Sequence, residues 1–220
     1  MRVLLTDHFV PADSASDRYG RLLARGLHRA GHDVRMLVVA DSRPPDEPFP
    51  QRVIISRADD PTADLPFGSP SFYEDSPAGI SFLDFGTEQL AAYRDEMRRQ
   101  LDVEVAEFDP QIIHAQHIWI EGQLALETGV PYVLTAWGPE LDCCAADPRY
   151  RDLVEQAAEN ASRVVVANQA LAGQVAARFD SIADRILVVP EIAAADGTDA
   201  GRILAEIYRD AFQQRFGRLP

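Results

Sequence analysis

Side chains that can move a proton follow several hydrophobic runs of this sequence. His114 and His117 lie at the end of one run, and Glu140 comes shortly after the next. Imidazole both donates and accepts hydrogen bonds, and a carboxylate can take a proton from a hydroxyl group. We therefore predict His114, His117 and Glu140 as catalytic residues. The alternatives are an ordinary hydrogen bond near the strand end for at least one histidine and a solvated carboxylate for Glu140.

Residues next to the same strand ends are candidates for ligand contacts. Trp119 and Trp137 offer flat apolar faces that stack on a sugar ring, with plain packing as the alternative. Asp142 follows a Gly-Pro pair, where the alternative to a site role is capping of the turn. The predicted substrate-binding residues are Asp7, His8, Ser16, Trp119, Trp137, Gly138, Asp142 and Asn168.

Several common site signatures are missing from the sequence. His114 and His117 are three residues apart, a spacing that shares a metal ion only on a helix, so we expect no metal site. No Gly-x-Gly-x-x-Gly or phosphate-binding P-loop follows the first strand, and no Gly-x-Ser-x-Gly occurs, so we expect no cofactor. Cys143 and Cys144 are adjacent and are expected to be reduced thiols.

The elements that position these residues follow an alternating pattern. Short runs of Val, Ile and Leu alternate with segments of helical periodicity, which is typical of βαβ units on a parallel sheet. Strands are predicted over 3–6, 34–39, 53–55, 112–115, 132–136, 164–167 and 186–189, and helices over 16–30, 87–107, 121–127, 148–160, 170–179 and 201–216. Ligands bind beyond the carboxyl ends of such strands, so the candidate residues should share one edge.

This pattern predicts an α/β fold, a single Rossmann-like three-layer domain with a mostly parallel sheet of about seven strands and a C-terminal helix that packs back on it. Residues 1–192 are the predicted domain, 193–200 a tether, and 201–216 the helix docked on the same domain. Residues 56–84 predict no regular element, although their aromatic side chains favour partial order. A loop of this length is usually disordered or functional, and acceptor selection is its candidate function.

The charge excludes several partner classes. The chain has 21 basic residues, all of them arginine, against 35 acidic ones, giving a formal charge of −14. Such a field repels nucleic acid and anionic lipid surfaces, although a local arginine cluster can still bind a phosphate. No apolar run approaches the roughly 20 residues that span a bilayer. With no leader segment before the first strand, the expected location is cytoplasmic.

Four stretches of sequence resemble a known family. They are MRVLL with a following helix that ends in AGHDV, FDPQIIHA at 108–115, TGVPYVLTAWGPELD at 128–142, and ASRVVVANQAL at 161–171 running on to ILVVP at 186–190. In this order the chain resembles the N-terminal, acceptor-binding domain of family-4 retaining glycosyltransferases, which belong to the two-Rossmann (GT-B) class. The resemblance implies hexosyl transfer from a nucleotide sugar to a small-molecule or glycan acceptor.

The sequence also departs from that family. The turn after the first strand lacks the usual glycine pair, and Trp137 stands where the family has a histidine that contacts the transferring sugar. The nucleotide-sugar domain is absent, and residues 201–216 resemble the helix that crosses back from that domain. The resemblance therefore implies the acceptor-side half of a sugar transferase, which would need a separate nucleotide-sugar-binding subunit.

Two other functions remain open from the sequence. The first is a catalytically inactive binding or scaffold protein of the same fold, favoured by the same two departures. The second is an enzyme of different chemistry that uses the same cleft, with His8, His114, His117 and Glu140 as its acid and base candidates. A homodimer is an alternative assembly to the two-subunit complex.

Overall fold

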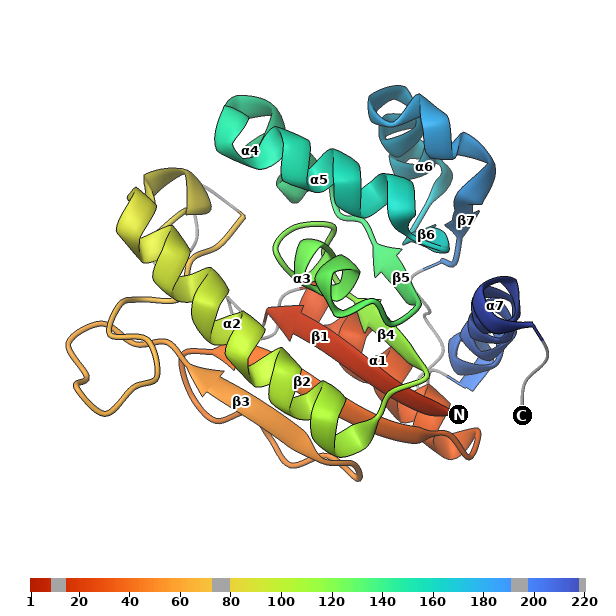
Figure 1. The fold of residues 1–220 in the computed structure, drawn as a ribbon, viewed down its shortest axis with the longest axis horizontal. Helices are drawn as coiled ribbons and strands as arrows, with labels where there is room; N and C mark the ends of the chain where they lie inside the picture. The colour runs from red at the N-terminus through yellow and green to blue at the C-terminus, as the bar shows by residue number, and fades with distance from the viewer. Residues whose placement is uncertain (9–14, 73–79, 191–197, 218–220) are drawn as a thin grey trace.

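A single parallel sheet forms the centre of the molecule (Figure 1). The computed structural model describes residues 1–8, 15–72, 80–190 and 198–217. Its strands are β1 (Arg2–His8), β2 (Asp33–Ala40), β3 (Gln51–Ile55), β4 (Ile112–Ala115), β5 (Tyr132–Thr135), β6 (Arg163–Val166) and β7 (Ile186–Val188). They lie side by side in the order β3-β2-β1-β4-β5-β6-β7, and every neighbouring pair is parallel. The predicted fold class is confirmed.

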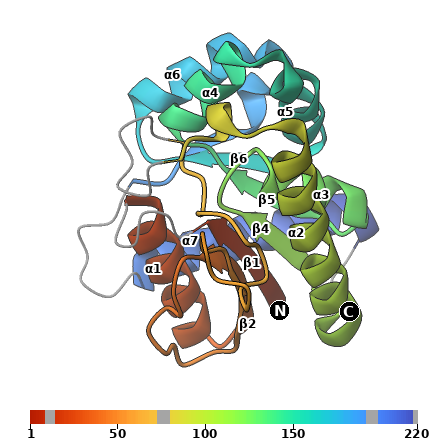
Figure 2. The same ribbon diagram turned by 90° about the vertical axis from the view of Figure 1, so that its left-hand side faces the viewer.

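Helices cover both faces of this sheet. They are α1 (Ala15–Arg29), α2 (Thr87–Phe108), α3 (Glu121–Thr128), α4 (Gly138–Ala146), α5 (Pro148–Asn160), α6 (Gln169–Arg178) and α7 (Thr198–Phe216), with 3₁₀ turns η1 (Phe82–Asp84) and η2 (Asp180–Arg185). Core residues of α2 to α6 belong to one hydrophobic cluster and those of α1 and α7 to the other. Figure 2 shows α1 on the opposite side of the sheet from α2 and α3. None of these helices is both long enough and apolar enough to cross a membrane, within the described residues.

The strand sequences explain why the core has two halves. Along β1, Leu4 points into the cluster under α2 to α6, whereas Val3 and Leu5 point into the cluster under α1 and α7. Successive side chains of a strand face opposite sides, so a sheet covered on both faces needs apolar residues at every position. This is the physical reason for the uninterrupted runs of Val, Ile and Leu.

The segment after β3 is partly ordered, as its aromatic residues suggested. Phe72, Phe82 and Phe85 are buried in the larger core cluster. Bridges pair Ser56 with Leu65 and Ser71 with Ser81, and η1 follows. Residues 73–79 of the predicted irregular segment lie outside the described residues.

One helix was missed in the sequence analysis, which read Gly138 and Pro139 as a turn. The two residues instead begin α4, where proline is well tolerated because the first N–H groups of a helix have no partner within it. Cys143 and Cys144 lie on α4, and both are buried and reduced, as predicted.

The final helix packs on α1, as predicted for the C-terminal helix. A Cβ atom on Gly201 would lie 2.4 Å from the carbonyl carbon of Gly26, so the two helix backbones approach closely at a glycine pair. Tyr208 of α7 is fully buried and its hydroxyl is hydrogen-bonded to Nδ1 of His114 on β4. Most of the predicted tether lies outside the described residues, and residues 198–200 form the first turn of α7.

Replacing Gly201 with alanine should separate α7 from α1. The added methyl group meets backbone atoms, which cannot rotate away, so we expect Gly201→Ala to lower the free energy of unfolding by about 1–3 kcal/mol. Thermal unfolding followed by circular dichroism measures this. The matched control is Gly173→Ala in α6, where an added Cβ atom would have no neighbour within 4 Å and alanine favours the helix. Equal melting temperatures for the two variants would contradict the close packing.

Candidate functional site

The candidate site lies where the sheet reverses its direction of growth. From β1 the chain adds β2 and β3 on one side, and then returns to add β4 to β7 on the other. Crossovers of this kind are right-handed, so the connecting helices leave on opposite faces and a crevice remains between the carboxyl ends of β1 and β4. Asp7 and His8 end β1, and Gln116 and His117 follow β4.

A small buried pocket occupies this crevice. Its lining residues are His8, Ser16, Phe72, His117, Trp137, Pro139 and Glu140. The free space is about 10 Å³, which is close to the minimum that holds one water molecule. The structure thus brings together five of the predicted site residues, which come from β1, the first turn of α1, and the segments after β4 and β5.

His117 lies between two buried carboxyl groups. Its Nδ1 is 3.3 Å from Oε2 of Glu140, and its Nε2 is 4.0 Å from Oδ1 of Asp7. Among the described residues, neither ring nitrogen makes a hydrogen bond of good geometry. The ring of Phe72 lies against the imidazole, 4.7 Å between centroids. Burial lowers the pKa of His117 to about 3, so the imidazole is neutral and has a nitrogen available as a hydrogen-bond acceptor.

Glu140 is held in place by backbone N–H groups. Oε1 accepts a hydrogen bond from the N–H of Trp137 at 2.8 Å, and Oε2 accepts one from the N–H of Ile118 at 2.9 Å. The first bond belongs to a capping box at the start of α4, so the helix start fixes the carboxyl group. Burial raises the pKa of Glu140 well above its usual range. The side chain is fully buried, which rules out the alternative of a solvated carboxylate.

Asp7 faces the pocket region from β1. Its Oδ1 accepts a hydrogen bond from the N–H of His8 at 2.7 Å, and its Oδ2 has no hydrogen-bond partner among the described residues. A Cβ atom on Gly20 would lie 2.1 Å from this Oδ2, so only glycine fits at that position of α1. Burial raises the pKa of Asp7 well above its usual range. The sequence analysis missed Gly20, because a single glycine within a helical pattern carries no clear signal.

His8 has a defined hydrogen-bonding state. Its Nε2 contacts the carbonyl oxygen of Pro70, which can only accept, so this nitrogen carries the hydrogen. Its Nδ1 therefore accepts from the hydroxyl of Tyr93, 2.6 Å away. Burial lowers the pKa of His8 to about 3, which keeps the imidazole neutral. Tyr93 comes from α2, and its helical spacing alone gives no signal of this contact.

A third buried carboxyl group adjoins the site. Glu121 begins α3, is almost fully buried, and has one oxygen without a partner among the described residues. Burial is the main cause that raises the pKa of Glu121 to about 8, and the nearby Glu140 makes a smaller contribution to that rise. Glu121 follows soon after β4 in the sequence, and this closeness to a strand end is the signal that could have identified it as a site residue. The site thus gathers carboxyl groups and imidazoles that burial keeps uncharged.

Other predicted site residues lie outside this pocket. His114 is fully buried on β4, with Nε2 hydrogen-bonded to the hydroxyl of Thr135 at 2.8 Å and Nδ1 to Tyr208. The indole of Trp119 is buried against the ring of Tyr150, 3.9 Å between centroids. Their arrangement shows hydrogen bonding and packing inside the core.

Three further candidates lie on α4 or at the start of α6. Gly138 is the first residue of α4, and Asp142 is exposed on the same helix. Asn168 caps α6 by accepting a hydrogen bond from the N–H of Leu171 at 2.9 Å. The ligand contacts predicted for these residues stay predictions. In the part of the chain that the structure describes, no group of three or more His, Cys, Asp or Glu side chains is arranged to hold a metal ion.

The fold and the position of the site define the class of protein. A parallel sheet covered by helices on both faces, with a polar crevice at its switch point, is a Rossmann-like fold, and the similar solved structures share it. Residues 15–191 match the glycosyl transferase 4-like domain family, and the chain belongs to this family. The resemblance found in the sequence is thereby confirmed. No match was found in the comparison with curated proteins.

Several solved structures are similar in fold. A sucrose-phosphate synthase structure from Thermosynechococcus elongatus has a TM-score of 0.58 and 18% identity, and the match covers 96% of this chain and 99% of that chain. A longer chain of this synthase has a TM-score of 0.56 and 18% identity, and the match covers 86% of the present chain and 48% of the synthase chain. UDP-GlcNAc 2-epimerase from Methanocaldococcus jannaschii has a TM-score of 0.53 and 10% identity, and the match covers 86% of the present chain and 45% of the epimerase chain.

These similarities show the fold alone, because all the identities are low. The present chain spans about half the length of the longer synthase chain and of the epimerase. The epimerase is named for a different reaction from the synthase, so the shared fold does not fix the chemistry.

The buried Glu121 predicts how stability should depend on pH. Its pKa is about 8 in the fold against an ordinary value of 4.5, so the folded chain holds a proton that the unfolded chain releases. Stability from this group is present below pH 4.5 and is lost as the pH rises toward 8. Glu121→Gln mimics the protonated acid, so it should raise the melting temperature at pH 8 by about 10 °C and change it far less at pH 5.

Differential scanning calorimetry at the two pH values measures this. The matched control is Glu155→Gln on α5, where the side chain is partly exposed, and it should show no such difference between pH 5 and pH 8. A gain for Glu121→Gln that is larger at pH 5 than at pH 8 would reverse the sign and refute the assignment.

Proposed function

We propose that this chain is the acceptor-side half of a sugar transferase, and that a separate nucleotide-sugar-binding subunit completes its cleft. The observation that carries the proposal is the position of the buried polar site within a domain of the glycosyl transferase 4-like family. The site lies at the edge of one sheet, and one sheet supplies one wall of a cleft. Sugar transfer depends on positioning and on stabilising the leaving group, which in this class requires two walls.

The comparison with sucrose-phosphate synthase supports a compact half of this kind. One structure of that synthase is matched over 99% of its own length, whereas the longer chain is matched over 48%. In the present chain, residues 189–197 lie between β7 and α7, and α7 packs on α1. A domain and a final helix are thus joined here over a short stretch of sequence.

The proposed roles follow from the hydrogen-bonding states in the pocket. His117 has a neutral imidazole whose nitrogens make no good hydrogen bond among the described residues, so it can accept one from an acceptor hydroxyl. Glu140 positions that imidazole at 3.3 Å, and backbone N–H groups fix Glu140 in turn. Trp137 closes the pocket, with its indole N–H donating to the carbonyl of Gln116 at 2.8 Å.

A second candidate function is that of a binding or scaffold protein without catalysis. The observation that favours it is the pocket volume of about 10 Å³, which holds about one water molecule and no sugar ring. Under the first proposal, docking of the donor subunit opens this pocket or places the acceptor above it. Under the second, the pocket stays closed.

Purification of the native complex tests the central claim. A tagged copy expressed in its own host should copurify with a protein that binds a nucleotide sugar, identified by mass spectrometry. Calorimetry with UDP-glucose, GDP-mannose and dTDP-glucose should show no binding to the chain alone and binding of one of them to the complex. Turnover of a nucleotide sugar by the isolated chain would refute the two-subunit proposal, and a partner that binds no nucleotide sugar would favour the scaffold function.

Substitution of His117 tests the site within the complex. His117→Gln should lower the transfer rate by about 100-fold, because a positioned acid–base group contributes roughly 10²- to 10⁴-fold. It should leave the affinity for the partner subunit unchanged, since the imidazole is buried. The control is His28→Gln in the last turn of α1, away from the pocket. Full activity of His117→Gln would remove this residue from the mechanism.

A further inference from the structure

The phenyl ring of Phe72 fills the space next to His117 in the buried pocket. The centroids of these two rings are 4.7 Å apart with an interplanar angle of 31°, and Phe82 packs on the phenyl ring in the same tilted way, at 4.6 Å and 36°. His8 and Trp119 make T-shaped contacts with it, at 6.2 Å and 6.1 Å. The phenyl ring therefore stands in an aromatic box formed by His8, Phe82, His117 and Trp119.

Phe72 is the member of this group that solvent reaches most. It is 9% exposed, whereas the four residues of the aromatic box are between 1% and 3% exposed. A ligand can therefore reach the place of the phenyl ring from the surface while the box residues stay in contact with the core. With the phenyl ring in place, the free space of the pocket is about 10 Å³, which is too small for any ring.

The backbone around the aromatic box is held by bonds that do not use the phenyl ring. The N–H of Ser71 donates to the carbonyl oxygen of Ile80 at 2.9 Å, and the N–H of Phe82 donates to the carbonyl oxygen of Ser71 at 3.1 Å. The hydroxyl of Tyr150 donates to the carbonyl oxygen of Phe82 at 2.7 Å. Rotation of the Phe72 side chain out of the box leaves all three bonds intact.

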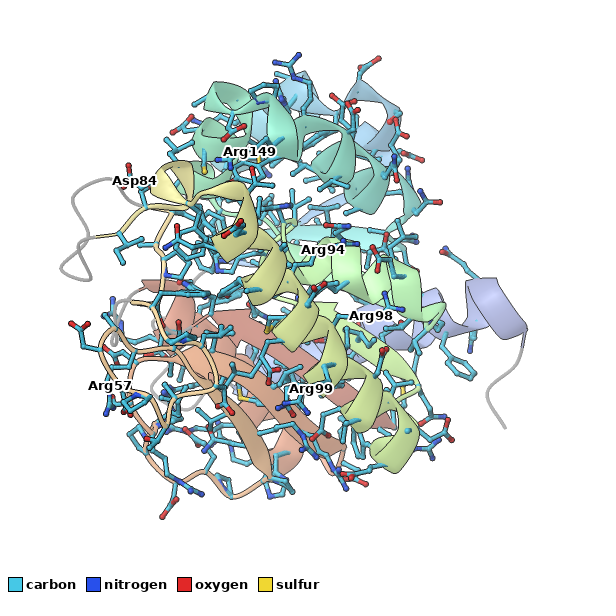
Figure 3. All side chains as sticks on the ribbon, turned by 60° about the vertical axis from the view of Figure 1, so that its left-hand side comes forward. Arg57, Asp84, Arg94, Arg98, Arg99 and Arg149 are labelled. Carbon is cyan, nitrogen blue, oxygen red and sulfur yellow. The ribbon has the colours of Figure 1, made fainter. Side chains whose placement is uncertain are left out.

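The turn that carries Phe82 is fixed to the rest of the domain. Asp84 accepts a hydrogen bond from the N–H of Ser81 at 3.1 Å and so caps η1, and Arg149 of α5 donates to the carbonyl oxygen of Phe85 at 2.7 Å (Figure 3). A wall held in this way is pre-organised, because it loses little conformational freedom when a ligand packs against it.

We propose that the place of the phenyl ring is a subsite for an uncharged flat ring, and that a hydroxylated ring of the acceptor, such as a phenol, displaces Phe72 there. The assignment to the acceptor rests on the proposed transferase function. A flat ring can stack on His117 and Phe82 as the phenyl ring does. The two imidazoles of the box are neutral, because burial lowers the pKa of His8 and of His117 to about 3, and this suits an uncharged ligand.

The polar side of the pocket explains why the ring should carry a hydroxyl group. Neither ring nitrogen of His117 makes a hydrogen bond of good geometry among the described residues, and Glu140 lines the same pocket. A buried polar atom without a partner is costly, and a hydroxyl group can both donate and accept. Phe72 then acts as a specificity-determining residue, since a ligand must compete with its phenyl ring for the stacking surface.

Calorimetric titration of the full chain tests the subsite. Phe72→Ala removes the phenyl ring, so phenol should bind this variant at least about 10-fold more tightly than the native chain, where the ring must first leave. Phenol should also bind the variant at least as tightly as toluene does. A purely apolar cavity would favour toluene instead, because phenol loses hydrogen bonds to water on entering.

The matched control is Phe67→Ala, which removes an equal ring from the same segment. Phe67 packs on Phe85 and does not line the pocket, so phenol should bind this variant as it binds the native chain. Should Phe72→Ala fail to fold, Phe72→Leu removes the flat ring but keeps an apolar side chain, and phenol should again bind more tightly than to the native chain. No gain in affinity for phenol in the folded variant, or tighter binding of toluene than of phenol, would overturn the subsite.

Inhibition of the purified complex tests the assignment to the acceptor. Phenol should raise the apparent KM for the acceptor and leave kcat unchanged, because the two compete for one place. Binding of phenol without competition would overturn that assignment. A complex that transfers no sugar would refute the transferase function together with the assignment, whereas the ring subsite would still be supported by the binding of phenol to Phe72→Ala.

Discussion

The reversal of the sheet between β1 and β4 is the constraint on which the rest of the structure depends. Because parallel strands must be joined by right-handed crossovers, growth of the sheet in two directions sends α1 to one face and α2 to α6 to the other. The strand ends at the reversal are then left without a covering helix. Asp7 and His117 meet there although they are 110 residues apart in the sequence.

Burial gives this crevice its chemical character. Removing a charged group from water is costly, so the carboxyl groups of Asp7, Glu121 and Glu140 retain protons and the imidazoles of His8 and His117 stay neutral. A strongly acidic protein therefore keeps its central site uncharged.

Strand positions and the face of each helix were predictable because hydrophobic periodicity reports burial directly. The candidate site was predictable only as a set of strand ends. His117 and Glu140 were correctly predicted to lie near the crevice, because each follows a central strand. The same reasoning was applied to His114, but the side chain of His114 points into the core beneath α7. The side of the sheet that a side chain faces depends on its position in the alternation along the strand. Near the end of a strand the sequence does not fix where this alternation stops.

Other features depended on contacts that no local pattern encodes. Glu140 is buried because α4 begins at Gly138, and a Gly-Pro pair is equally typical of a turn and of a helix start. Gly20 is required by the carboxylate of Asp7, which approaches it from another element. Likewise Glu47 is nearly buried by two arginines of α1, although it lies in a proline-rich segment that predicts an exposed loop.

The hydrogen bond between Tyr208 and His114 has a consequence for how the chain unfolds. It ties the last helix to a strand in the middle of the sheet, so α7 cannot detach without leaving polar groups of the core unpaired.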